Sequence, residues 1–278
     1  MTAPMDLSSD QFTRLEQSFL RSVSRFYPSA GNDGLRQAQE GSIQAFDALC
    51  LADLLRAQKP ETILEIGSFL GFSTRWILEV CQPWQPRVRS VDPGIRHRSF
   101  NNASDHLLSF NRPFIEQGAL SLTRAFFSLP GEDLSCYLHD YGAYHPRLDI
   151  ETAMQTLDSV GKIAGLNEAC DFYFIDGDHS RAATSANVTS CLRSHATSGR
   201  SGTIVVHGAV AWPEVVPGIL QALVECPRMV NPFYVVGCDD EGSFLDLYQQ
   251  NRFVRKRATV ATNIKSNGLA VLKLAPAV

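Results

Sequence analysis

The segment Glu61–Leu78, ETILEIGSFLGFSTRWIL, constrains the fold of this chain more than any other. It opens with a short apolar run, rich in β-branched residues, that predicts a buried strand over Ile63–Ile66. Two glycines then predict a tight turn in which another group can approach the backbone. Ser73 and Thr74 are residue types that cap helices, so a helix is expected from Arg75 onward. Such a strand, turn and helix are typical of a nucleotide-sized site, although a turn without a ligand is the alternative.

Beyond this segment, short apolar runs alternate with longer helical stretches, which is typical of an α/β protein with a doubly wound, parallel sheet. The length of 278 residues and the hydrophobic content of 44% suit one medium α/β domain. The predicted strands are Ile63–Ile66, VRSVD ending at Asp92, either PFIEQ or LSLTRAFF, DFYFID ending at Asp176, GTIVVH ending at His207, Phe233–Val236 and Leu269–Leu274.

Residues 1–58 are expected to form an N-terminal helical cap, not an independent domain, ahead of the main domain at 59–278. Apolar residues recur from Phe12 at helical spacing until Pro28 closes the pattern. The polar, glycine-rich segment AGNDGLRQAQEGS predicts a loop, and Ile43–Ala57 predicts a second helix. The apolar stripe of the first helix serves either the core or a dimer surface, so a homodimer is possible.

Residues 129–170 show little periodicity over PGEDLSCYLHDYGAYHPRLD, which is rich in aromatic residues and histidine. Long loops in compact domains often serve as lids or binding loops. We therefore predict a lid-like insertion that covers the substrate.

Composition argues against several classes of partner. A formal net charge of −4 does not favour nucleic acid. No apolar run approaches the ~18–20 residues of a membrane span, so no membrane partner is expected. The N-terminus lacks the pattern of a signal peptide, and the seven scattered cysteines without a CxxC pair favour a reducing compartment. A cytoplasmic location is expected.

Several predicted strands end in an ionisable residue: Glu65, Asp92, Asp176 and His207. Open α/β sheets bind ligands outside the carboxyl ends of their strands, so these side chains mark a candidate site. Asp92 lies roughly 20 residues beyond the glycine turn, where dinucleotide sites carry the acid that binds ribose. A carboxylate suits this task because it can accept hydrogen bonds from two vicinal hydroxyls.

The glycine spacing narrows the kind of nucleotide. A dinucleotide site uses G-x-G-x-x-G against a pyrophosphate, whereas this chain reads E-x-G-x-x-x-G. Glu65 would repel a pyrophosphate but can hold an ammonium group, directly or through water. A nucleoside with a cationic tail is therefore expected, and an NAD-dependent oxidoreductase is a disfavoured alternative.

The segments LEIGSFLGFST, VRSVDPG, FYFIDGDHS, GTIVVHGAV and GLAVLKL resemble the successive motifs of class I S-adenosylmethionine-dependent methyltransferases. The resemblance covers roughly residues 45–278 and is closest to the O-methyltransferase-like branch that acts on small molecules or sugars, whose fourth motif reads I-D-G-D-H. It implies a Rossmann-like, seven-stranded, mostly parallel sheet with an antiparallel last strand. It also implies S-adenosylmethionine as cofactor, S-adenosylhomocysteine as product, and as acceptor a hydroxyl, less readily an amine, of a small molecule such as a sugar or natural-product intermediate.

The resemblance further implies that the Glu65–Gly71 turn contacts the methionine part of the cofactor, that Asp92 contacts its ribose, and that the adenine lies after the third strand, near Phe126. The residues expected to bind the cofactor are Glu65, Gly67, Ser68, Phe69, Gly71, Ser73, Asp92, Phe127, Ser128 and Asp176.

Methyl transfer to an oxygen requires alignment of the reactants and removal of a proton. His207 and His179 are the candidate bases because imidazole titrates near neutral pH. Asp176 is expected to act with them, and either Asp176 or Asp178 could orient them or hold a metal ion.

Metal dependence stays open at this point. Relatives that bind magnesium use an acid after the fourth strand and an acidic or amide pair after the fifth, whereas this chain has Gly208 in the second place. Magnesium is therefore not favoured, although Asp176, Asp178 and His207 are candidates for a softer divalent ion. Gly208 also motivates the alternative of a non-catalytic paralogue that binds the cofactor without turnover.

Overall fold

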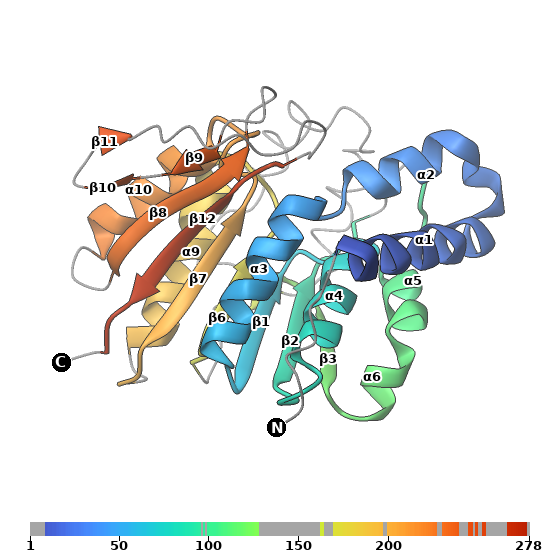
Figure 1. Cartoon of the computed structure of the whole chain (residues 1–278), viewed down its shortest axis with the longest axis horizontal. Coiled ribbons are helices and arrows are strands. Elements are labelled where there is room, and N and C mark those ends of the chain that lie inside the picture. The colour runs from blue at the N-terminus through green and yellow to red at the C-terminus, as the bar shows by residue number, and fades with distance from the viewer. Residues whose placement is uncertain are drawn as a thin grey trace.

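The computed structural model (Figure 1) describes residues 9–95, 97, 99–127, 162–163, 169–196, 199–226, 230–238, 244–246, 248–249, 252–253 and 266–276. These residues form a twisted sheet with helices on both of its faces. Among the described helices, none has the length and apolar character needed to cross a membrane.

The main sheet has eight strands in the order β3-β2-β1-β6-β7-β12-β8-β9. Its strands are β1 Thr62–Ile66, β2 Arg87–Asp92, β3 Leu120–Arg124, β6 Phe172–Ile175, β7 Gly202–His207, β8 Val230–Cys238, β9 Phe244–Asp246 and β12 Leu269–Leu274. Two smaller pairs are β4 Phe126–Phe127 with β5 Lys162–Ile163, and β10 Tyr248–Gln249 with β11 Arg252–Phe253.

The sheet confirms the predicted α/β fold. Strands β3, β2, β1, β6 and β7 pair in parallel, and β12 runs antiparallel between β7 and β8. The short strand β9 adds an eighth member that the sequence did not predict. The third strand is Leu120–Arg124, whereas the competing segment PFIEQ belongs mainly to the helix α6, Arg112–Glu116. Pro113 lies in the first turn of that helix, where its missing N–H costs nothing.

The N-terminal region contains three α-helices. They are α1 Ser9–Phe26, α2 Gly31–Glu40 and α3 Ala45–Gln58, and a short 3₁₀ turn, Pro28–Ala30, links the first two. The loop predicted for AGNDGLRQAQEGS was wrong, because most of it forms α2. This helix buries only Gly34 and Ala38, four residues apart, so its apolar stripe is too small for hydropathy to reveal.

Two layers of helices cover the sheet. Besides the N-terminal helices, the described residues form α4 Phe72–Cys81, α5 Ala103–Phe110, α6, α9 Arg181–Ala196 and α10 Val215–Glu225. Figure 1 shows α3 and α4 on one face of the sheet and α9 and α10 on the other. Strand side chains alternate between two cores: Phe172 and Phe174 join the core under α3 and α4, while Tyr173 and Ile175 join the core under α9 and α10.

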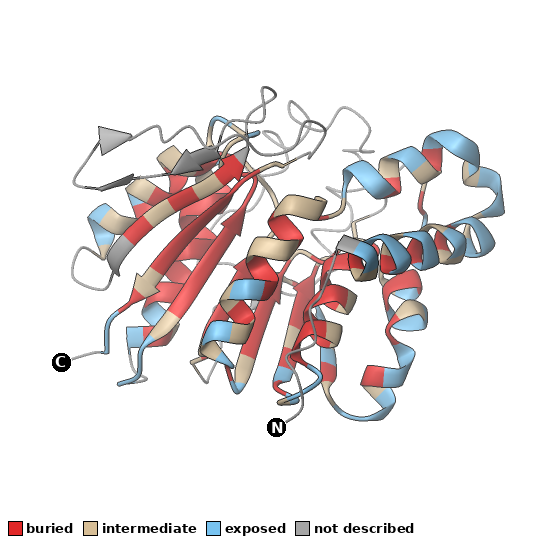
Figure 2. Ribbon diagram, viewed as in Figure 1, coloured by how far each residue is buried: buried red, intermediate tan, exposed pale blue. Residues whose placement is uncertain are grey.

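The apolar stripe of α1 faces the protein interior (Figure 2). Phe12, Leu15, Phe19 and Val23 are all buried and belong to the same core as the sheet residues. The stripe is therefore buried in the core of its own chain, and it offers no support for the dimer surface that the sequence left open.

The register of the central strands sets the geometry of the candidate site. Ile66 lies opposite both Val91 and Ile175, and Ile175 lies opposite Val206. The residues that follow these positions are Gly67, Asp92, Asp176 and His207, so they form one row along the carboxyl edge of the sheet.

Candidate functional site

The row at the carboxyl edge brings together three of the four ionisable residues that the sequence placed at strand ends. Asp92, Asp176 and His207 lie in it, whereas Glu65 lies two residues further inside the sheet than Gly67. The chain adds β2 and β3 on one side of β1 and then crosses to β6 on the other. The point between β1 and β6 is therefore the switch point at which open α/β sheets bind ligands.

The carboxylate of Asp92 organises the turn after β1. One of its oxygens accepts the backbone N–H groups of Ser68 at 2.8 Å and Phe69 at 2.9 Å, and the other accepts that of Gly94 at 2.7 Å. These bonds hold Phe69 at φ +46°, which a bulky residue rarely adopts. Asp92 is 9% exposed, and its contact with a ribose stays a prediction.

Hydroxyl groups gather around Asp92. Ser68 and Ser90 share a buried hydrogen bond between their side chains. The Oγ of Ser104 is buried and has no hydrogen-bond partner among the residues that the structure describes. It lies close to Gly94, because a Cβ built there would be 2.5 Å from it. A buried polar atom of this kind suits a hydroxyl-bearing ligand at the end of β2.

At the two glycines of the turn, protein atoms fill the space that a side chain would take, whereas the sequence suggested that this space serves a ligand. Gly67 has φ +81°, and a Cβ there would lie 2.4 Å from the carbonyl oxygen of Asp176. Gly71 has φ +87°, and a Cβ there would lie 2.7 Å from Nδ2 of Asn111 and 2.8 Å from Leu107. Both glycines are thus required by backbone conformation and by close protein packing.

Glu65 is completely buried, and α4 holds its carboxylate. The hydroxyls of Ser73 and Thr74 donate to its two oxygens at 2.7 Å and 2.5 Å. Burial raises the pKa of Glu65 to about 7, although these hydrogen bonds oppose the increase. The predicted capping by Ser73 and Thr74 was wrong, since α4 begins at Phe72 with Gly71 as its N-cap. Cofactor contacts of Glu65 and Ser73 stay predictions.

His207 lies between two carboxylates. Its Nδ1 is 2.7 Å from Oδ1 of Asp176, and its Nε2 is 3.3 Å from Oδ2 of Asp47. Ionised carboxylates only accept hydrogen bonds, so both ring nitrogens act as donors. Burial lowers the pKa of His207, but the two carboxylates outweigh this effect and raise it to about 10. A ring that is protonated at neutral pH cannot accept a proton, so this geometry favours a supporting role for His207.

His179 faces the same carboxylate from the other side. Its Nε2 is 3.7 Å from Oδ1 of Asp176, and its ring stacks on Trp212 with 5.1 Å between centroids. Gly208 explains why this arrangement fits, because a Cβ at Gly208 would lie 2.4 Å from the ring of His179. The space that a side chain at position 208 would need is thus filled by the ring of His179.

The structure groups other candidate metal ligands than the sequence predicted. Asp176, His179 and His207 bring one ligand atom each within 4.8 Å of one another. Asp178 is not in this group and instead accepts the backbone N–H of Ser180 at 2.6 Å, just before α9. The group does not fit magnesium, which prefers oxygen ligands, and His207 could bind a softer ion only after losing one of its two hydrogen bonds.

The expected adenine contacts are only partly described. Phe127 lies in β4 and is buried in the core beneath α9 and α10. Ser128 and nearly all of the insertion at 129–170 lie outside the described residues. These assignments stay predictions.

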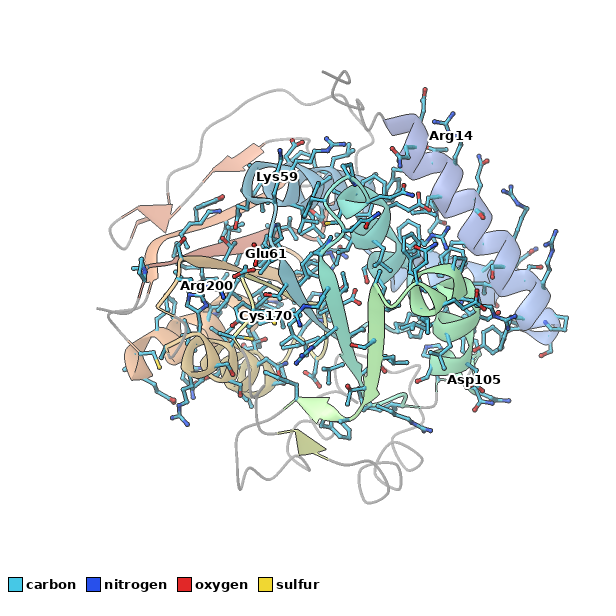
Figure 3. The ribbon with its side chains drawn as sticks, turned by 90° about the horizontal axis from the view of Figure 1, so that it is seen from below. Arg14, Lys59, Glu61, Asp105, Cys170 and Arg200 are labelled. Carbon is cyan, nitrogen blue, oxygen red and sulfur yellow. The ribbon has the colours of Figure 1, made fainter. Side chains whose placement is uncertain are left out.

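A cavity of about 550 Å³ lies at the opposite edge of the sheet, at the amino ends of the parallel strands. Figure 3 views the molecule from this side and labels Lys59, Glu61 and Arg200 of its wall. Arg200 is 3.4 Å from Asp171 and 3.8 Å from Glu61, so its charge is already compensated. The row at the carboxyl edge therefore remains the candidate site.

Asp47 is the site residue that sequence reasoning missed. It comes from α3 and is fully buried beside His207. The pattern of α3 carried a signal, because Asp47 precedes Leu51 by four residues and thus lies on the buried face with Leu51 and Leu55. A carboxylate on the apolar face of a helix requires a buried partner.

Solved structures of methyltransferases resemble this fold at low sequence identity. A methyltransferase of Podospora anserina, PaMTH1, solved with S-adenosylhomocysteine, has a TM-score of 0.50 at 10% identity, over 99% of this chain and 98% of that one. The O-methyltransferase TomG of Streptomyces achromogenes, involved in tomaymycin synthesis and solved with S-adenosylmethionine, has a TM-score of 0.50 at 16% identity, over 94% and 89%. These likenesses define a class I methyltransferase fold.

The sequence itself decides the family. Residues 64–208, more than half of the chain, match the model of a family described as a methyltransferase domain. The chain belongs to this family, which confirms the class I methyltransferase prediction. No curated protein matches the sequence.

Proposed function

We propose that this protein transfers a methyl group from S-adenosylmethionine to a hydroxyl group of a small molecule, such as a sugar or a natural-product intermediate. The observation that carries the proposal is the row of Asp92, Asp176 and His207 at the switch point of a methyltransferase-family sheet. The O-methyltransferase TomG, which has the same fold, supports oxygen as the acceptor atom.

The two ends of this row suit different parts of the reaction. Asp92 and the buried Oγ of Ser104 form a polar surface for the nucleoside half of the cofactor. The cofactor, when bound, supplies an electrophilic methyl group on a sulfonium. His179 is the general base that we assign for the acceptor hydroxyl, and Asp176 orients its ring. His207 holds Asp176 in turn through the 2.7 Å hydrogen bond.

Calorimetric titration with S-adenosylmethionine, S-adenosylhomocysteine and NAD, each with and without EDTA, tests this proposal. We expect saturable binding of the first two ligands and none of NAD, unchanged by EDTA because the donor set does not fit magnesium. Binding of NAD alone would overturn the proposal. Loss of binding in EDTA would overturn the conclusion about the metal.

A second experiment separates an enzyme from a non-catalytic paralogue. The protein is incubated with radiolabelled S-adenosylmethionine and a set of phenols, sugars and aliphatic alcohols, and the formation of S-adenosylhomocysteine is measured. Turnover above that of the His179→Ala variant supports an enzyme. Tight cofactor binding without turnover on any acceptor would favour the paralogue.

We also propose a cytoplasmic location. The five cysteines that the structure describes as free, among them the buried Cys81 and Cys191, suit a reducing compartment. Fractionation of the source cells with an antibody against the protein tests this proposal.

A further inference from the structure

Asp47 has more partners than a helix-stabilising acid requires. It lies in the first turn of α3, where the helix dipole already favours a carboxylate. An exposed acid would meet that need, yet Asp47 is 0% exposed. Removing a carboxylate from water is costly unless several donors replace the lost solvation. The identity of those donors therefore indicates what Asp47 does.

The first donor is the ring of His207, 160 residues away in sequence, at 3.3 Å. This residue projects from the end of β7 onto the face of the sheet that α3 covers, because Thr203, Val205 and His207 share that face. Its other nitrogen donates to Asp176 at 2.7 Å. The imidazole of His207 therefore bridges the two carboxylates, with Asp47 on one side of the ring and Asp176 on the other.

The second group of donors is the turn before β12. The backbone N–H of Asn267 donates to Asp47 at 2.7 Å, that of Gly268 lies at 3.3 Å, and the Ser266 hydroxyl also donates. The backbone carbonyls of the same turn accept hydrogen bonds from the loop after β7. Gly268 accepts from the N–H groups of Gly208 at 2.8 Å and Ala209 at 3.2 Å, and Asn267 accepts from that of Val210 at 2.9 Å.

The same loop completes the acceptor half of the site. Gly208 packs against the ring of His179, and Trp212 stacks on that ring. A single buried carboxylate on the N-terminal helix therefore contacts both supports of the Asp176–His179 pair: the His207 ring and the turn that anchors residues 208–212. In the part of the chain that the structure describes, Asp92 bonds to Ser68, Phe69 and Gly94, and no hydrogen bond joins this nucleoside half to Asp47.

We propose that Asp47 is a positioning residue that links the N-terminal helix α3 to the methyl-acceptor half of the site, by fixing the ring of His207 and the 266–268 turn together. This proposal rests on the proposed function. It assigns the N-terminal helices a role in transfer that is separate from cofactor binding.

The test compares Asp47→Ala, which removes the acceptor of the His207 ring, with Asp53→Ala. Asp53 lies on the same helix, but its side chain is 81% exposed and pairs with Arg56 one turn further along that helix. The ring nitrogens of His207 are observed at pH 7 in ¹H–¹⁵N spectra, with signals assigned by their loss in His207→Asn. Binding of S-adenosylhomocysteine is measured in parallel by calorimetry.

We expect two protonated ring nitrogens on His207 in the wild type and in Asp53→Ala. In Asp47→Ala the Nε2–H signal should be lost, while affinity for S-adenosylhomocysteine stays within about threefold because the nucleoside half is a separate site. An unchanged ring spectrum in Asp47→Ala would overturn the proposal. So would a loss of affinity beyond about tenfold, because it would place Asp47 in the cofactor half.

Two further measurements keep the outcome decisive. If Asp47→Ala does not fold, the wild-type spectrum still tests the contact, because an unprotonated Nε2 would exclude donation to Asp47. Ser266→Ala removes one donor of the turn and should leave the His207 signals in place. If wild-type protein fails to bind S-adenosylhomocysteine, the proposed function fails, while the ring spectra still report on Asp47.

Discussion

At the scale of single residues, the site depends on side chains that are missing as much as on those that are present. Gly208 combines a left-handed backbone with a close approach of His179, so no other residue fits there without movement. The packing of His179 against position 208 therefore explains why the chain has no side chain there.

Replacing Gly208 by alanine should destabilise the protein more than replacing Gly118. Both glycines have a left-handed φ, +81° and +72°, but a Cβ at Gly118 meets nothing within 4 Å. The backbone conformation costs each variant about 1–3 kcal/mol, and the clash with His179 adds to the cost only at Gly208. Denaturant unfolding measures the difference. Equal losses in the two variants would contradict the packing described here.

Glu65 should make the stability of the protein fall as pH rises. Its pKa is about 7 in the folded state against 4.5 ordinarily, so the folded state binds this proton more tightly. The contribution is fully present below about pH 4.5 and is lost as pH rises through about 7.

Between pH 5 and pH 8 the wild-type protein should lose on the order of 3 kcal/mol of its free energy of unfolding through this fully buried group. The Glu65→Gln variant should not show this loss. Urea unfolding at both values measures it. Glu116→Gln, at an exposed position of α6, should retain the wild-type pH dependence. A Glu65→Gln protein with the wild-type slope would show that Glu65 titrates normally.

At the scale of elements, α1 is an integral part of the core. Phe19 is 1% exposed and packs against Phe72 of α4 with ring centroids 5.1 Å apart. Phe12 of the same helix packs edge-on to Trp76 of α4 at 5.6 Å. The N-terminal helices thus fix the orientation of α4, whose hydroxyls hold Glu65.

Phe19→Ala should therefore lower the free energy of unfolding by about 3–5 kcal/mol, the usual effect of truncating a buried phenylalanine. Phe26→Ala, on the same helix but 40% exposed, should cost less than about 1 kcal/mol. Chemical denaturation of both variants checks this. A small effect at Phe19 would mean that α1 is not docked in solution.

At the scale of the whole molecule, one core joins residues from the N-terminal helices and from the sheet. Phe12, Leu51, Trp76 and Phe172 belong to the same buried cluster. We propose on this ground that residues 1–58 form a cap that cannot fold apart from the domain at 59–278.

The protein should accordingly unfold in a single cooperative transition. Differential scanning calorimetry should give equal calorimetric and van't Hoff enthalpies, and saturating S-adenosylhomocysteine should shift the whole transition upward, because it binds only the folded state. Two separate transitions, of which only the second responds to the ligand, would contradict a shared core.

The sequence by itself determined most of the sheet strands of this protein and the edge at which its candidate site lies, but not α2 or β9. The strands at Ile63–Ile66, Asp92, Asp176 and His207 were predicted because apolar periodicity and turn residues act between near neighbours in the chain. A strand ending in a polar residue can be recognised in the same way, so Asp92, Asp176 and His207 were found without the structure.

Only the tertiary structure decided what those residues do. Asp92 holds the turn after β1, Ser73 and Thr74 hold Glu65 instead of capping a helix, and His207 donates to Asp176 and Asp47. These contacts join residues up to 160 positions apart, through the register of the sheet and the docking of α3. Hydrogen bonds of buried groups are satisfied by whatever the fold brings near, and no local pattern of residues encodes that choice.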